Sequence, residues 1–177
     1  LQQRLSWCRE VAEAVVWIHS RGVIHCDIQP TNLILDNGMH IKLADFQGKL
    51  LSRDDGTTVL LDGGSGEPCR FYCPRADPSE ADVKTDLFAL GCTIYFIVMG
   101  HPVFPDIVDG EDGWYEKVSA RFANGQFPQD SHVCSDIVSK CWRKEYESAE
   151  DVLHDIELVE KGPLTGGDDA QDVQGNG

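Results

Sequence analysis

Apolar residues recur at three- and four-residue steps through the first 20 residues. They are Leu5, Cys8, Val11, Ala12, Val15 and Ile18. This spacing gathers the apolar side chains on one face of a helix, because one helical turn takes between three and four residues. Gly22 follows and is suited to stop a helix at its C-terminus. We therefore predict an amphipathic helix over residues 1–20.

A short β-hairpin is predicted next. Leu33-Ile34-Leu35 is apolar, and residues 39–43 alternate between apolar and polar. Asp36-Asn37-Gly38 lies between these two runs. Asn-Gly favours a tight turn, because both residues tolerate positive φ.

The longest apolar stretch runs from Leu87 to Met99. It is apolar on all sides, which predicts a helix buried on every face, and we place this central helix at residues 86–99. The stretch is too short to span a bilayer. Two or three further helices are expected near residues 112–124, 131–142 and 148–160. The last of these opens with Ser148 and Asp151, which can form a capping box.

Composition limits the partners and the cellular setting. The formal net charge is −15, which argues against nucleic acid and anionic membrane as partners. Seven scattered cysteines fit reduced thiols in an intracellular, cytoplasmic protein. Residues 161–177 are rich in glycine and acidic residues and have little to bury, so we expect a disordered tail.

Two motifs flank the predicted hairpin. The first spans residues 25–32 and reads His-Cys-Asp-Ile-Gln-Pro-Thr-Asn, and the second is Asp45-Phe46-Gln47. Together they resemble the catalytic loop H-R-D-L-K-P-x-N and the metal-binding D-F-G motif of protein kinases, in the right order and at the right spacing. Pro30 follows the serine/threonine version of the loop. The resemblance covers residues 1–160 and implies a mainly α fold, the large (C-terminal) lobe of a protein kinase with short β-hairpins at the catalytic cleft.

The resemblance also implies catalytic and binding roles. Asp27 would orient the substrate hydroxyl, and Gln29 stands where the family has a lysine that meets the transferring phosphate. Asn32 and Asp45 would hold magnesium and, through it, ATP. A glutamine brings no positive charge to the transition state, so we expect Gln29 to slow the transfer more than it weakens nucleotide binding.

Structural roles follow from the same resemblance. His25 would brace Phe46 rather than act as an acid or base. Asp86 opens a segment, residues 86–91, that resembles the family's D-x-W-S-x-G motif, and it would face backbone amides of the catalytic loop. Cys26 replaces the arginine that reads a phosphate on the activation segment, and Gln47 replaces the glycine of D-F-G.

Residues 45–75 would form the activation segment. Its end, Phe71 to Arg75, stands in the place of the family's A-P-E motif, so Arg75 replaces a glutamate that normally pairs with an arginine. We expect the pair to survive with reversed polarity, Arg75 binding Glu147 or, failing that, Glu145. The alternative is that these residues are solvated surface charges.

The function implied by the resemblance is phosphoryl transfer from ATP to serine or threonine of a protein substrate. The residues before His25 hold neither a glycine-rich loop nor a strand lysine, so we expect upstream sequence to supply the small lobe. The alternative function is a catalytically inactive pseudokinase module that binds partner proteins. The retained Asp27, Asn32 and Asp45 favour the enzyme. The alternative is favoured by the absence of the small lobe and by Gln29 and Gln47.

Overall fold

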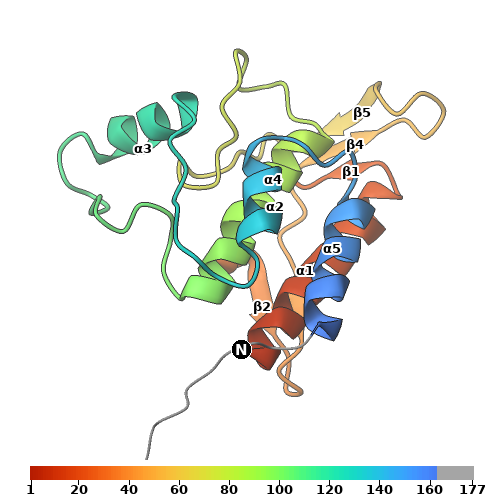
Figure 1. The fold of residues 1–177 in the computed structure, drawn as a ribbon. Helices are drawn as coiled ribbons and strands as arrows, with labels where there is room; N and C mark the ends of the chain where they lie inside the picture. Colours follow the sequence, from red (N-terminus) through yellow and green to blue (C-terminus); the bar gives the residue numbers. More distant parts are fainter. Residues whose placement is uncertain (163–177) are drawn as a thin grey trace, which may run out of the picture.

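The computed structural model describes residues 1–162 of the chain. Helices make up most of the ordered structure, and short strands gather at two places (Figure 1). The helices are α1 (Gln2–His19), the 3-10 turn η1 (Pro30–Asn32), α2 (Val83–Met99), α3 (Trp114–Ala123), α4 (Ser135–Trp142) and α5 (Ala149–Lys161). The strands are β1 (Val23–Ile24), β2 (Leu33–Leu35), β3 (Ile41–Leu43), β4 (Lys49–Leu51) and β5 (Val59–Asp62). The predicted mainly α fold with short antiparallel strands is confirmed.

Helix α1 follows the predicted apolar pattern. All six residues of that pattern are buried, and α5 lies alongside α1 on the outside of the molecule (Figure 1). The capping box that opens α5 is also confirmed, since Ser148 and Asp151 exchange side-chain and backbone hydrogen bonds. Helix α5 runs to Lys161, so the predicted tail cannot begin at residue 161. The rest of that tail, residues 163–177, lies outside the described residues.

Helix α2 begins one turn earlier than predicted, at Val83 rather than Asp86. The reason is a capping box in which the Asp82 side chain accepts from the Thr85 amide and the Thr85 side chain accepts from the Asp82 amide. Gly100 ends the helix in the left-handed conformation, with φ of 82°. The helix is buried over most of its length, as its composition predicted.

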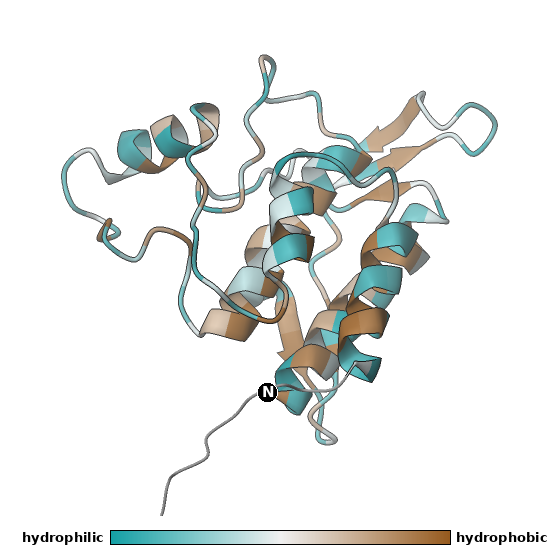
Figure 2. Cartoon of the chain, in the orientation of Figure 1, coloured by the Kyte–Doolittle hydropathy of each residue, from teal (hydrophilic) through white to brown (hydrophobic). Residues whose placement is uncertain are grey.

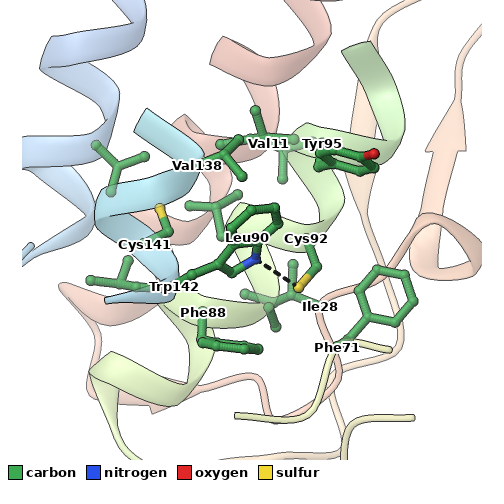
Figure 3. Close-up of a cluster of buried hydrophobic side chains, with 14 of the residues drawn as sticks. Val11, Ile28, Phe71, Phe88, Leu90, Cys92, Tyr95, Val138, Cys141 and Trp142 are labelled. Carbon is green, nitrogen blue, oxygen red and sulfur yellow. Dashed lines mark hydrogen bonds between the residues drawn. The ribbon is translucent and has the colours of Figure 1, made fainter. Parts of the chain in front are cut away.

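The core forms where α2 crosses α1 and α4. Figure 3 shows side chains of all three helices in one cluster, with Trp142 donating a hydrogen bond to the Cys92 sulfur at 3.2 Å. Gly91 permits the close approach of α4, because a Cβ at this position would lie 2.5 Å from the Cys141 Cβ. All seven cysteines are buried and free.

The hairpin of β2 and β3 is confirmed, with Leu33 opposite Leu43 and Leu35 opposite Ile41. Its turn differs from the prediction. Positive φ occurs at Met39, at 63°, and not at Asn37 or Gly38. The Asp36 carboxylate accepts from the amides of Gly38 and His40, which favours this longer turn over a tight Asn-Gly turn.

A second, three-stranded antiparallel sheet has the order β1-β4-β5. No periodic pattern marks β4 and β5 in the sequence, because each has only three or four residues and they lie in a segment rich in glycine and charge. Figure 2 shows both strands as hydrophobic ribbons at one edge of the molecule. None of the helices within residues 1–162 is both long and apolar enough to cross a membrane.

Candidate active site

The two motifs meet at the base of the β2–β3 hairpin. The Ala44 amide donates to the Asn32 carbonyl at 2.9 Å, which extends the pairing of the two strands by one residue. Asn32 closes the catalytic loop, and Asp45 follows Ala44 directly. The hairpin register therefore places Asn32 next to Asp45, although Asp45 lies 13 positions further along the sequence.

Hydrogen bonds hold the Asp27 carboxylate on both oxygens. The Gln29 side-chain amide donates to Oδ1 at 2.6 Å, and the Asn32 side-chain amide donates to Oδ2 at 2.8 Å. The same Asn32 nitrogen also donates to the Asp27 carbonyl at 2.8 Å. Burial raises the pKa of Asp27, while the amides of Asn32 and Gln29 oppose that shift. The loop thus fixes this carboxylate in one orientation.

The Asp45 backbone adopts the left-handed conformation, with φ of 64°. The carboxylate is exposed, and its Oδ1 accepts a hydrogen bond from the Gln47 side-chain amide at 2.6 Å. The Gln47 backbone amide also donates to the Asp45 carbonyl, at 3.0 Å. Two contacts therefore link the first and third residues of the motif.

His25 is buried behind this motif. Its ring lies 5.3 Å from that of Phe46, centroid to centroid, and its Nε2 donates to the Ala44 carbonyl at 3.0 Å. Phe46 itself remains 55% exposed. This arrangement suits a bracing residue, because the imidazole contacts the segment that carries Asp45 and does not reach an acceptor in the open part of the site.

Asp86 anchors the catalytic loop from α2. Its carboxylate is fully buried and accepts from the backbone amides of His25 at 2.7 Å and Cys26 at 2.9 Å. Cys26 has φ of 62°, a conformation that costs energy for a residue with a side chain and that these bonds support. Burial, followed by the charge of Asp86, raises the pKa of the Cys26 thiol to about 12.

Sequence reasoning missed His19 in this network. Its Nε2 lies 2.9 Å from the Asp86 carboxylate, so it is the third group that contacts that oxygen pair. Its position in the last turn of a helix, six residues before His25, was the available signal.

The expected pair of Arg75 with Glu147 is wrong. Arg75 instead binds Glu67, with Nη2 to Oε2 at 2.8 Å, and its guanidinium lies 4.3 Å from the Tyr72 ring centre. The Glu67 side chain is fully buried. Glu147 pairs with Lys84 and stays 83% exposed. The chain turns back after Pro68, which accepts from the Phe71 amide, and this turn supplies Arg75 with a partner from its own segment.

Arg70 was also missed. It is buried, and its guanidinium donates to the carboxylate of Asp109 and to the backbone carbonyls of Val103, Phe104 and Ile107. These contacts tie the segment that carries Arg70 to the loop between α2 and α3. The Arg70–Asp109 separation of 39 residues left no local signal in the sequence.

The donor set fits magnesium. The Asn32 nitrogen is committed to Asp27, which leaves the Asn32 amide oxygen without a hydrogen bond within residues 1–162. The Asp45 carboxylate offers a second oxygen donor, and the hairpin register brings the backbones of the two residues together. Both side chains supply the hard oxygen ligands that magnesium prefers, and this ion is commonly held by one or two carboxylates together with phosphate oxygens. Residues 1–162 contain no cluster of three or more His, Cys, Asp or Glu side chains, as a metal cage built from protein alone would require.

Two surface hollows border the site, and Phe46 lines both. One, of about 770 Å³, lies between α1 and β3 and carries several charged side chains. The other, of about 480 Å³, is apolar, and is lined by Trp17, Ile18, Val23, Phe46, Gly48, Lys49, Leu50 and Leu61. The carboxylates of Asp27 and Asp45 line neither of them.

Comparisons with known proteins agree with this geometry. The family described as "Protein kinase domain" matches residues 2–153. The chain is 41% identical to 3-phosphoinositide-dependent protein kinase 1 of Arabidopsis thaliana over 142 residues, 74% of this chain and 28% of that protein. It is 29% identical to serine/threonine-protein kinase PLK4 of Drosophila virilis over 171 residues, 93% of this chain and 21% of that protein. The chain thus spans less than a third of the length of these relatives.

Proposed function

The chain belongs to the protein kinase family, and from this premise we propose that it forms the large lobe of a serine/threonine protein kinase. That enzyme would transfer the γ-phosphoryl group of ATP to a hydroxyl of a protein substrate. The observation that carries the proposal is the convergence of Asp27, Asn32 and Asp45 at the base of one hairpin, with hydrogen bonds that fix Asp27 on both carboxylate oxygens.

Each of these residues has a distinct role in the proposal. Asp27 orients the attacking hydroxyl and accepts its proton. Asn32 and Asp45 would hold magnesium, and that ion would supply positive charge to offset the charge of the phosphates. Gln29 lies against Asp27 and offers the transferring phosphate a neutral amide, which stabilises developing charge less than a lysine would. His25 and Asp86 keep the loop in place through Phe46 and the loop amides.

Calorimetric titration with ATP and Mg²⁺ tests the proposal. We expect the chain to bind weakly, above the micromolar range, because a phosphate-clamping glycine-rich loop is not found in the residues before His25. The matched control is Asp45→Asn, which keeps the shape of the side chain and removes its charge. Heat that disappears in this variant supports the proposal. Equal binding by both proteins would refute it.

A second candidate is a pseudokinase module that binds partner proteins. The observation that favours it is that the side chains facing Asp27 and Asp45 are amides: within residues 1–162, no lysine or arginine bonds either carboxylate. The apolar hollow beside Phe46 would then serve as part of a protein contact. Failure of the calorimetric test would leave this candidate in place of the enzyme.

A further inference from the structure

The two carboxylates of the site share an unusual local contact. Gln29 follows Asp27 by two residues and Gln47 follows Asp45 by two residues, and each glutamine donates its side-chain amide to the earlier carboxylate at 2.6 Å. Asp27 is also held by Asn32, whereas within the described residues Gln47 is the only side chain that bonds Asp45. The side-chain orientation of Asp45 therefore depends on Gln47.

This contact occupies an oxygen that a metal ion would need. Any one lone pair of a carboxylate serves either a hydrogen-bond donor or a cation, and Asp45 is the single acidic ligand of the proposed magnesium site. The amide nitrogen of Gln47 sits on Oδ1, where a cation bound through both oxygens would also sit. A glycine at position 47 would have no side chain to make this contact.

We propose that Gln47 competes with the divalent cation for Asp45, so that the cation binds only after the glutamine amide has been displaced. The inference rests on the proposed function, because it concerns regulation of the same metal site. Gln47 is a positioning residue in this account, since it acts through Asp45 and does not touch the substrate. The competition lowers the apparent affinity for the cation.

The size of the effect follows from where the contact lies. Asp45 and Gln47 are both exposed, so water replaces the lost hydrogen bond when the amide leaves. A hydrogen bond of this kind has a net worth of roughly 1 kcal/mol, and so removing it should tighten cation binding by about 3- to 10-fold. Removing Gln47 would instead weaken cation binding if its amide oxygen turned inward and was itself a ligand.

The test uses Mn²⁺ alone and follows the electron paramagnetic resonance signal of the free ion. The chain is strongly acidic and will bind some Mn²⁺ elsewhere. The site is therefore defined as the binding component that is lost in Asp45→Asn. Gln47→Ala is the test variant. Gln129→Ala is the matched control, because Gln129 is exposed and bonds only the neighbouring carbonyls of Phe127 and Pro128.

We expect Gln47→Ala to bind Mn²⁺ about 3- to 10-fold more tightly than the wild type, and Gln129→Ala to match the wild type. An unchanged affinity of Gln47→Ala for Mn²⁺ would overturn the proposed competition. A weaker affinity would also overturn it, because it would show that Gln47 is a ligand of the ion. If the wild type has no component that depends on Asp45, the proposed metal site itself fails. Those results are distinguishable, because only the last one removes binding from the wild type.

A second measurement reports the contact without relying on affinity. The side-chain amide resonances of Gln47 should shift when Asp45→Asn removes the carboxylate, and Mg²⁺ added to the wild type should move them the same way. The Gln47 resonances could fail to shift with Mg²⁺ although the Mn²⁺ titration shows binding that depends on Asp45. In that case the cation and the glutamine would bind Asp45 together, and the competition would be wrong.

Discussion

At the scale of single residues, charges in this protein find partners of two kinds. The carboxylates of the site are held by amides close in sequence, as with Gln29 on Asp27. Elsewhere, buried charged side chains pair with side chains of opposite charge. Glu67 with Arg75 is the clearest case, because both side chains are at most 9% exposed. A buried ion pair adds little net stability, because desolvation offsets the attraction, but losing one partner leaves an uncompensated buried charge.

Arg75→Met should therefore cost about 3–5 kcal/mol of unfolding free energy at neutral pH, measured by urea denaturation. Burial already raises the pKa of Glu67, against the opposing effect of Arg75. Without the arginine that pKa rises further, so the folded state binds a proton more tightly than the unfolded state does. The loss should then shrink as the pH falls toward 4.5, the ordinary value for glutamate.

Glu147→Gln is the control for this prediction. Glu147 is 83% exposed in its pair with Lys84, and its replacement should cost less than about 1 kcal/mol. A large loss in Glu147→Gln together with a small loss in Arg75→Met would contradict the pairing that the structure shows.

Some features of single residues could be predicted from the sequence and others could not. Asp27, Asn32 and Asp45 could be identified as candidate site residues, because the motifs that carry them are short and continuous. The partner of Arg75 was not readable, because it depends on a turn at Pro68 that brings Glu67 back toward the arginine. The catalytic role of Asp27 and the metal-binding roles of Asn32 and Asp45 stay predictions.

At the scale of elements, local signals predicted the helices and missed the small sheet. Helix α1 has an apolar residue at nearly every turn, and α5 begins at a capping box, so both could be predicted within one or two residues. Strands β4 and β5 are too short for alternation to show, and β4 pairs on its other side with β1, which lies far away in the sequence. Helices α3 and α4 are shorter than predicted, because residues near 112 and 131 belong to loops instead.

The crossing of α2 and α4 gives a prediction at this scale. Gly91→Ala should lower the unfolding free energy by about 1–3 kcal/mol, because the new Cβ would lie 2.5 Å from that of Cys141. In a Cys141→Gly background the clash is absent. There the same substitution should instead stabilise the protein by up to about 1 kcal/mol through its higher helix propensity.

Gly66→Ala serves as the control for the crossing. A Cβ at Gly66 would meet no atom within 4 Å, and this residue is not among the glycines with positive φ. Its replacement should change stability by less than about 0.5 kcal/mol. If Gly91→Ala were equally neutral in thermal or urea unfolding, the close approach of the two helices would be wrong.

At the scale of the whole molecule, polar and apolar surfaces are unevenly distributed. The chain carries a net charge of −15, yet exposed apolar side chains gather around the hollow beside Phe46. Trp17 is 59% exposed and Leu61 is 64% exposed there. Large apolar patches of this kind are rare on monomers and mark surfaces that bind other molecules or aggregate. Helix α1 contributes Trp17 to this surface, and strand β5 contributes Leu61.

We expect the purified chain to bind a hydrophobic dye or to self-associate through this patch. Trp17→Gln combined with Leu61→Ser should reduce the dye fluorescence and the apparent mass in light scattering, with little loss of stability because both side chains are mostly exposed. Tyr115→Gln combined with Leu158→Ser is the matched control, since these side chains are 51% and 56% exposed and line none of the hollows beside the site.

A wild-type chain that stays monomeric and does not bind the dye would contradict the prediction. Repulsion between the negatively charged chains would then outweigh the attraction between apolar patches. If both double variants lowered the dye fluorescence and the apparent mass equally, the surface that self-associates would lie elsewhere.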